Sequence, residues 1–463
     1  MDREKTLEAL EQISDRHIEE AARPPKKTRA AWISAVAAIL AVAICIGIFL
    51  GPARITVKAV ALPGESRLMP CPLYKDFENW NDYKEVYDRY AAQAKERVPY
   101  RTEAVSGLQQ FFVDGNREFL SDGTENRLWS PVNAYIGLAM VAELAEGESR
   151  QQILDLFEAE NIEELRQQVS AVWETTCGEG CTLANSLWLE NGLRYKQETV
   201  ENLAYHYYAS VYQGNLGSDA VKQAIGDWLN ESLQGIFGDV PAIELTEETL
   251  MALYSTICFQ SLWYSRFWEK DNTQGIFHGT NGEKQVTFMN SKPKQLDYYW
   301  GDTFGAVEMQ LGKGTMWFIL PDEGLTTADV LADGQYMQMI SGAEWENKKY
   351  MRVNLSVPKF DISAKLDLQD GLKNLGVTDV FSAQDADFSG ITSRSPLYLG
   401  GVDQSIRVMI DEEGVKAGAY VEEPLYGAMV PPDEIIDFIL DRPFLFVIER
   451  NGLLLFAGCV NDP

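Results

Sequence analysis

Hydrophobic and polar positions recur with two different periods along this chain of 463 residues, and the period changes near the middle. In the first half, apolar residues return every three or four positions, which is the spacing of one helix face. This spacing predicts helices at 105–120, 130–146, 197–208 and 218–237, with one strand at 183–189. The helix at 130 begins with Ser130 as N-cap and Pro131 at its first position, an arrangement that suits a helix start.

In the second half, apolar and polar residues alternate with a period of two, which predicts strands. The predicted strands lie at 254–261, 286–289, 307–311, 316–320, 351–357, 406–411, 444–449 and 453–459, with a further helix at 366–375. Helices early and strands later indicate an α+β domain with large, mostly antiparallel sheets, because alternating βαβ units would interleave the two kinds of element.

The first 102 residues form a separate region. Residues 31–50 carry no charge, and twenty residues of helix span about 30 Å, one hydrocarbon thickness. A basic cluster at 23–29 precedes this run, so the positive-inside rule places the N-terminus in the cytoplasm. We expect a cytoplasmic tail at 1–30, a single-pass transmembrane helix at 31–50 and an extracellular stalk at 51–102. The alternative is a cleaved signal peptide, but the leader and the apolar run are both long for one.

Composition excludes several classes of function. The chain has 40 basic and 69 acidic residues, and its net charge of −29 lies entirely beyond residue 30. A field this negative repels phosphate, so we expect no nucleic-acid partner. The three histidines and six cysteines show no metal-ligand spacing, so we expect no metal. We find no enzyme motif, and His206 is expected to pack in a helix rather than act as a base. Cys177 and Cys181 are spaced to allow a small surface disulfide in an oxidising exterior.

Eight segments, taken in order, carry a family resemblance. They are LWSPVNAYIGLAMVAELAEG (128–147), IGDWLNESLQGI (225–236), TICFQSLWYSRFWEKDNT (256–273), FILPDEG (318–324), VPKFDI (357–362), LGVTDVFSAQDADFSGI (375–391), PLYLGG (396–401) and DRPFLFVIERNGLLLFAGCVNDP (441–463). Together they resemble the serpin family of serine protease inhibitors over residues 103–463. The resemblance implies one monomeric serpin domain with a helical first part, large sheets and an exposed reactive-centre loop. It implies no cofactor and no catalytic residue.

Residues 410–434 have the character of a loop and of a strand at once. Their glycines, prolines and acidic residues are typical of an exposed loop. The first part nevertheless alternates with a period of two, and one face carries Val415, Ala417, Ala419 and Val421. The pattern alone fits either an ordinary edge strand followed by a turn or a loop that can insert into a sheet. The serpin resemblance favours the inserting loop.

The resemblance also implies a register for this loop. Glu412, Glu413 and Gly414 match the family's hinge motif, and the cleaved bond follows the residue fourteen places after that glycine. The reactive bond is therefore expected between Ala428 and Met429. The recognition residues before it are expected to be Leu425, Tyr426 and Gly427. The hinge is expected to comprise Glu412, Glu413, Gly414, Val415, Lys416, Ala417, Gly418 and Ala419. We expect Val415 to be the first of these residues to pass from the exposed loop to the buried face of the sheet.

The resemblance further implies two polar sites, called shutter and breach, that control opening of the main sheet. The residues expected there are Ser130, Asn133, Ser255, Trp263 and Gln404. Ser255 and Gln404 stand where the family commonly has Asn and His, and Asn133 stands where Ser is common. These departures bear on the energetics of opening rather than on the fold.

The expected function follows from the loop. We expect an extracellular inhibitor of serine proteases that acts as a suicide substrate, with one N-terminal helix in the cell membrane. Ala428 offers only a methyl group, which suits the shallow pocket of an elastase- or subtilisin-like protease. The alternative is a non-inhibitory serpin that acts as a binding or chaperone module, because Gly418 and Tyr420 depart from the family's usual run of small residues.

Overall fold

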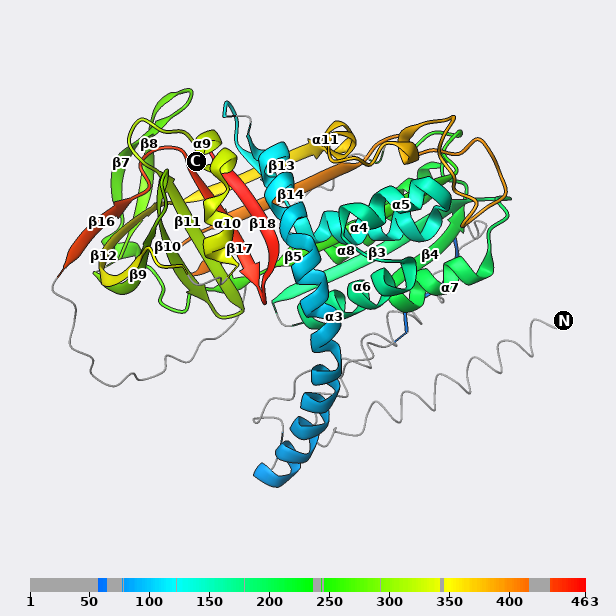
Figure 1. Cartoon of the computed structure of the whole chain (residues 1–463), viewed down its shortest axis with the longest axis horizontal. Coiled ribbons are helices and arrows are strands. Elements are labelled where there is room, and N and C mark those ends of the chain that lie inside the picture. Colours follow the sequence, from blue (N-terminus) through cyan, green and yellow to red (C-terminus); the bar gives the residue numbers. More distant parts are fainter. Residues whose placement is uncertain are drawn as a thin grey trace, which may run out of the picture. The chain divides into compact units, whose positions relative to one another are not determined.

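The computed structural model describes residues 57–64, 77, 79–121, 123–178, 180–235, 243, 245–291, 293–341, 345–415 and 434–463 (Figure 1). The chain divides into two units, residues 1–55 with 69–92 and residues 56–68 with 93–463. The first unit contains the start of helix α3 (Trp80–Leu120), which continues into the second unit after residue 92. Trp80, Tyr83, Tyr87 and Tyr90 follow one another along this helix with ring centroids 5.4–6.1 Å apart.

The expected cytoplasmic tail and transmembrane helix lie outside the described residues. None of the helices in the described part of the chain combines the length and the hydrophobicity needed to cross a membrane.

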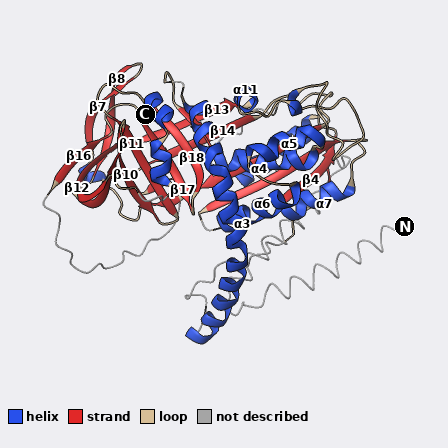
Figure 2. Cartoon of the chain, in the orientation of Figure 1, coloured by secondary structure: helices blue, strands red, loops and turns tan. Residues whose placement is uncertain are grey.

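The described helices of the second unit lie mostly in the first half of the chain (Figure 2). After α3 they are α4 (Pro131–Leu144), α5 (Gly147–Leu156), α6 (Ile162–Thr176), α7 (Gln197–His206), α8 (Asp219–Ser232), α9 (Thr327–Asp333), α10 (Gln335–Ile340), α11 (Gln369–Asn374) and the 3₁₀ turns η2 (Glu269–Asp271) and η3 (Asp379–Phe381). Helix α4 packs against both β5 and β18, and thirteen of its residues are buried, so it is apolar on nearly every side.

The strands of the second unit form three hydrogen-bonded sheets among the described residues. The first has the order β1 (Val57–Ala61), β4 (Ala209–Gly214), β3 (Cys181–Glu190) and β5 (Met251–Phe259). The second has the order β13 (Phe360–Asp367), β14 (Asp403–Ile410), β15 (Gly414–Val415) and β6 (Ser261–Leu262).

The third sheet is the largest. It follows the order β2 (Arg127–Trp129), β18 (Leu453–Val460), β17 (Phe444–Arg450), β11 (Gly314–Pro321), β10 (Phe304–Leu311), β9 (Lys294–Trp300), β12 (Lys348–Pro358), β8 (Gly282–Asn290) and β7 (Thr273–Gly279), with β16 (Ile435–Ile439) parallel to β12. Helices in the first part and large, mostly antiparallel sheets confirm the expected α+β fold class.

Strand β3 shows why the first sheet is covered on both faces. Leu187 belongs to the main core, which also contains residues of α4, α6 and α7. The next residue, Trp188, points to the opposite face, where it joins Val221 and Ile225 of α8 in a second cluster. Successive side chains of a strand alternate between faces, so one strand contributes to both layers.

The structure differs from the expected elements in several places, among them the strands β4, β7 and β9, which were not predicted. Residues 51–102 are not simply a stalk, because β1 pairs with β4 at the edge of the first sheet and α3 begins at Trp80. The predicted helix at 366–375 begins later, since β13 continues to Asp367 and pairs there with β14. Helices α5 and α6 were not predicted, although Asn161 caps α6 by accepting a hydrogen bond from the Glu164 amide.

Candidate functional site

The main candidate site is the gap between β5 and β14. Neither strand pairs with the other among the described residues: β5 pairs with β3, and β14 pairs with β13. At one end, the two-residue strand β15 fills the gap. Val415 pairs with Ile410 of β14 on one side and with Ser261 of β6 on the other. Strand β6 follows β5 after one residue, so β15 connects the first sheet, which ends in β5, with the second sheet, which contains β14. We call these two sheets together the main sheet and each of them one half of it.

Gly414 occupies a position where no side chain fits. A Cβ atom there would lie 2.2 Å from the Ser261 carbonyl oxygen and 2.7 Å from the Leu262 Cα. Both are backbone atoms and cannot rotate away. The hinge glycine is therefore required by the close approach of two chains.

The expectation that Val415 is exposed before the loop inserts is wrong. Its exposed fraction is 5%, and it belongs to the main hydrophobic core. In this structure Gly414 and Val415 already form a strand between β14 and β6. The sequence could not show this, because the alternating pattern is the same before and after insertion.

The residues just before β15 are held by side chains and backbone of a neighbouring segment. Lys359 Nζ lies 2.8 Å from Glu412 Oε2, and Asn272 Nδ2 donates to Glu412 Oε1. The amide of Trp263 donates to the Glu413 carbonyl at 2.9 Å, and its indole donates to the Asp411 carbonyl at 2.9 Å. Burial alone would raise the pKa of Glu412, but the hydrogen bonds from Lys359 and Asn272 outweigh it and lower the pKa.

The expected shutter residues are brought together beneath the gap. Asn133 of α4 donates to Ser255 of β5 at 2.8 Å and accepts from Gln404 of β14 at 3.1 Å. Asn133 thus joins the two strands that border the gap. Gln404 also accepts from the Ser130 amide at 2.8 Å and donates to the Ser130 carbonyl at 3.0 Å. Trp263 lies apart from this group, beside β15.

Ser130 is the N-cap residue of α4 by position, but its side chain does not cap the helix. Its hydroxyl donates instead to the Leu455 carbonyl of β18. This bond attaches the start of α4 to the largest sheet.

The far end of the loop is anchored at Glu434, which the sequence did not single out. Both carboxylate oxygens of Glu434 lie 2.6 Å from Lys349 Nζ, and the Glu434 carbonyl accepts from the Arg352 amide at 3.0 Å. Strand β16 then continues beside β12. No local pattern reveals these pairs, because Lys349 and Glu434 are 85 residues apart.

The remaining expected loop residues lie outside the described residues. They are Lys416, Ala417, Gly418, Ala419, Leu425, Tyr426, Gly427, Ala428 and Met429.

The disulfide that the spacing of Cys177 and Cys181 would allow is not formed, and both thiols are free. Cys181 is buried on β3, and burial raises the pKa of its thiol to about 12. Gly178 and Cys181 exchange backbone hydrogen bonds of 2.7 and 3.1 Å, which close this turn without a covalent bond.

His206 is buried at the end of α7. Within the described residues, no cluster of three or more His, Cys, Asp or Glu side chains is placed to hold a metal ion.

A split main sheet with a strand-like loop entering the gap is the arrangement that defines one class of protein. The model of the family described as serpin (serine protease inhibitor) matches residues 107–463. The chain belongs to the serpin family.

Individual relatives agree with the family match. The chain is 28% identical over 356 residues to alpha-1-antiproteinase 2 of Equus caballus, covering 73% of this chain and 82% of the relative. It is 26% identical over 360 residues to leukocyte elastase inhibitor A of Mus musculus, covering 74% and 94%. Among solved structures, the thermophilic serpin tengpin in its native state has a TM-score of 0.68 at 25% identity, covering 78% of this chain and 94% of tengpin.

Proposed function

We propose that this serpin inhibits extracellular serine proteases as a suicide substrate. The observation that carries the proposal is β15, where Gly414 and Val415 of the loop already pair between β14 and β6. The relatives named antiproteinase and elastase inhibitor support an inhibitory rather than a purely structural role.

In the proposed mechanism, the catalytic serine oxygen of the protease attacks the carbonyl carbon of Ala428. The bond from that carbon to the Met429 nitrogen breaks, and the amine leaves with a proton from the protease. Ala428 is then joined to the protease as an ester, the acyl-enzyme of ordinary proteolysis. Water would normally release it, so inhibition depends on the loop moving first.

Insertion of the freed loop would supply that movement. The fourteen residues from Val415 to Ala428 span about 45 Å as a strand. A domain of about 360 residues has a radius of gyration of about 21 Å, so the protease would be carried across most of the domain. Distortion of the protease then removes the oxyanion stabilisation that deacylation requires.

The direct test is to incubate the full-length chain with an elastase, a subtilisin and a trypsin and to separate the products on a denaturing gel. A covalent band at the summed mass of the protease and residues 1–428 supports the proposal, together with release of a C-terminal fragment beginning at Met429. Cleavage at this bond without a covalent band would instead support the alternative, a non-inhibitory binding or chaperone module. Gly418 and Tyr420 are the residues that favour this alternative.

We further propose that residues 31–50 anchor the protein in the cell membrane with residues 1–30 in the cytoplasm. The support is the uncharged twenty-residue run and the basic cluster before it. The tests are alkaline carbonate extraction of isolated membranes and, on separate intact cells, proteolysis from outside. An anchored ectodomain stays with the membrane and is cut from outside; a processed, secreted domain appears in the medium.

A further inference from the structure

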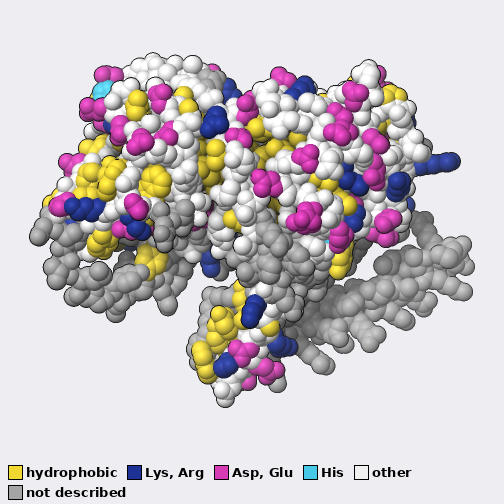
Figure 3. Space-filling model, in the orientation of Figure 1, with side chains coloured by type: hydrophobic (Ala, Val, Ile, Leu, Met, Phe, Trp, Pro, Cys, Tyr) yellow, Lys and Arg dark blue, Asp and Glu magenta, His cyan; other side chains and the backbone are white. Residues whose placement is uncertain are grey.

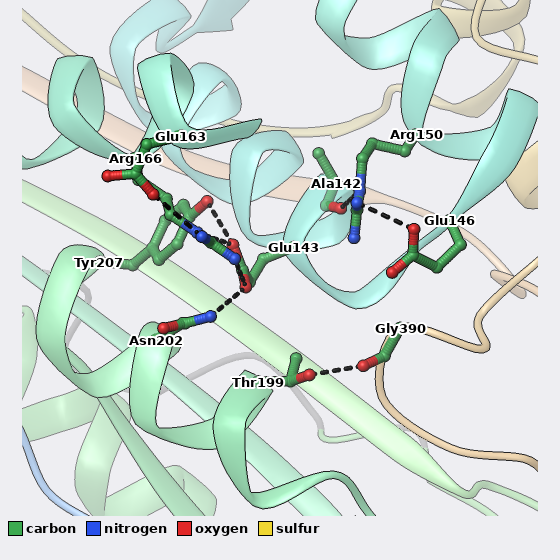
Figure 4. A network of polar contacts seen from close by, with 10 residues as sticks. All are labelled: Ala142, Glu143, Glu146, Arg150, Glu163, Arg166, Thr199, Asn202, Tyr207 and Gly390. Carbon is green, nitrogen blue, oxygen red and sulfur yellow. Dashed lines mark hydrogen bonds and ion pairs between the residues drawn. The ribbon is translucent and has the colours of Figure 1, made fainter. Parts of the chain in front are cut away.

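Glu143, close to the end of α4, is a buried carboxylate with an exposed fraction of only 2%. It accepts four hydrogen bonds from three side chains (Figure 4). Arg166 of α6 donates through Nε at 2.8 Å and Nη2 at 2.7 Å. Asn202 of α7 donates at 2.9 Å, and the Tyr207 hydroxyl donates at 3.1 Å. We call these four residues the Glu143 cluster.

The donors of the cluster are attached to the first sheet. Tyr207 follows α7 directly, and its carbonyl accepts from the Asn185 side chain of β3 at 2.7 Å. Ser170 of α6 donates to the His206 carbonyl at 2.8 Å, which ties α6 to the end of α7. Strand β4 begins at Ala209, two residues after Tyr207. Helices α6 and α7 are therefore bound to the half of the main sheet that ends in β5.

The acceptor of the cluster is attached to the other half. Helix α4, which carries Glu143, is bonded to β18 through Ser130 and to β14 through three hydrogen bonds with Gln404. Against these stands a single hydrogen bond to β5, from Asn133 to Ser255. A second hydrogen bond also joins the two halves: Thr199 of α7 donates to the Gly390 carbonyl, in the segment that leads to β14 (Figure 4). The Glu143 cluster thus crosses the line along which β5 and β14 would separate.

We propose that the Glu143 cluster is a latch that holds the main sheet closed until the loop is cleaved. This inference rests on the proposed insertion mechanism and concerns which contacts limit the rate at which the sheet opens. A strand inserted along the whole gap must lie about 4.8 Å from both β5 and β14, so these strands must separate where Asn133 now joins them. A hydrogen bond to a carboxylate extends only to about 3.2 Å. Movement of α6 and α7 with β5 therefore breaks several bonds to one buried charge.

The charge makes these bonds matter more than neutral ones. Hydrogen bonds between a guanidinium and a carboxylate are stronger than neutral hydrogen bonds, and a bidentate pair also fixes the geometry. The hydrogen bonding of the Arg166 guanidinium to Glu143 is the largest cause that raises the pKa of Arg166, so the guanidinium keeps its charge at neutral pH. A carboxylate separated from its donors inside the protein is costly, which raises the barrier to opening.

The test measures opening of the sheet without any protease. A synthetic peptide with the sequence of residues 415–428 is added to the full-length chain, and its incorporation is followed by native gel and intact mass. We expect Glu143→Gln to take up the peptide at least tenfold faster than the parent, a change of about 1.4 kcal/mol in the barrier. Asn202→Ala and Tyr207→Phe each remove one bond, so they are expected to accelerate uptake less. They also provide the test if Glu143→Gln does not fold.

Two control variants separate the latch from general destabilisation. Glu163→Gln removes the other carboxylate paired with Arg166, at 3.1 Å, but Glu163 lies on α6 itself. Ser170→Ala breaks the bond between α6 and α7, which lie on the same side of the line. Both controls should take up the peptide at the parental rate, even where urea unfolding shows reduced stability.

Three outcomes are decisive. Faster uptake confined to the Glu143 cluster supports the latch. Parental uptake in Glu143→Gln, or equal acceleration in the two controls, overturns it while leaving the proposed inhibition intact. No peptide uptake by the parent or any variant would overturn the insertion mechanism and the latch together.

Discussion

At the scale of single residues, we assign different roles in the loop to Val415 and Ala428. Val415 is buried between two strands in the uncleaved protein. Ala428 is the residue that we propose a protease recognises. Substitutions at these two positions should therefore have different effects, one on insertion and one on target choice.

Val415→Arg should convert the inhibitor into a substrate. The guanidinium would need a partner at a position now filled by an apolar side chain, and burying it unpaired costs several kcal/mol. Because Val415 is already buried, the uncleaved protein should also lose about 1.5–3 kcal/mol of stability. The measurements are the stoichiometry of inhibition and the urea midpoint before cleavage. A variant that traps protease at the parental stoichiometry would contradict insertion.

Ala428→Arg should change the target class without changing the mechanism. Arginine pairs with the buried aspartate of a trypsin-like pocket, whereas alanine suits a shallow pocket. We expect the association rate to fall for elastase and to rise at least a hundredfold for trypsin. Mass spectrometry of the cleaved chain checks the register: a cut after Tyr426 or Met429 would mean that the reactive bond is misplaced.

At the scale of elements, the short strand β15 depends on contacts outside itself. A strand of two residues is not stable alone, because so few backbone hydrogen bonds cannot hold it in place. Glu412, bound by Lys359 and Asn272, fixes the segment that leads into β15. The ionisation of Glu412 should therefore influence how firmly the hinge is seated.

The hinge is predicted to weaken in acid. The folded-state pKa of Glu412 lies below its ordinary value of 4.5, so the contribution is complete above that value and is lost as the pH falls through the lower folded pKa. Glu412→Gln should cost about 1 kcal/mol at pH 7, and the difference from the parent should shrink below pH 4.5. Thermal unfolding across pH 3–7 measures it. The neighbouring exposed Glu413→Gln is the control, and an equal effect there would count against the hinge pair.

At the scale of the whole molecule, acidic side chains are spread over the visible face rather than gathered in one patch (Figure 3). On this face, the described acidic residues give a distributed negative charge that repels anionic partners. The property that we predict for the whole domain is instead a gain in stability when the cleaved loop enters the main sheet.

Cleavage at Ala428 should make the protein more stable. The new strand would add ladder hydrogen bonds and bury the inward residues Ala417, Ala419 and Val421, which together contribute several kcal/mol or more. We expect the thermal midpoint to rise by about 10 °C or more, measured by calorimetry on chain cut after Ala428. Val415→Arg cut at the same bond should show little of this rise. An unchanged midpoint in the cleaved parent would show that its sheet does not accept the loop.

Much of the fold could be predicted from the sequence because its signals are local. Helix α4 follows from Pro131 and the apolar run after it, and strands β17 and β18 follow from two short apolar segments separated by a turn. The dual character of residues 410–434 was also visible, since glycines and a period of two are both properties of neighbouring residues. These features need no knowledge of distant contacts.

The remaining features depend on residues that only the folded chain brings together. Glu412 meets Lys359 across 53 residues, and Asn133 meets Gln404 across 271. The same holds for the Glu143 cluster, whose members look like ordinary polar helix residues in the sequence. Whether Val415 is buried before cleavage was likewise decided by tertiary structure, because a strand pattern specifies which face can be buried but not when a neighbouring strand is present to bury it.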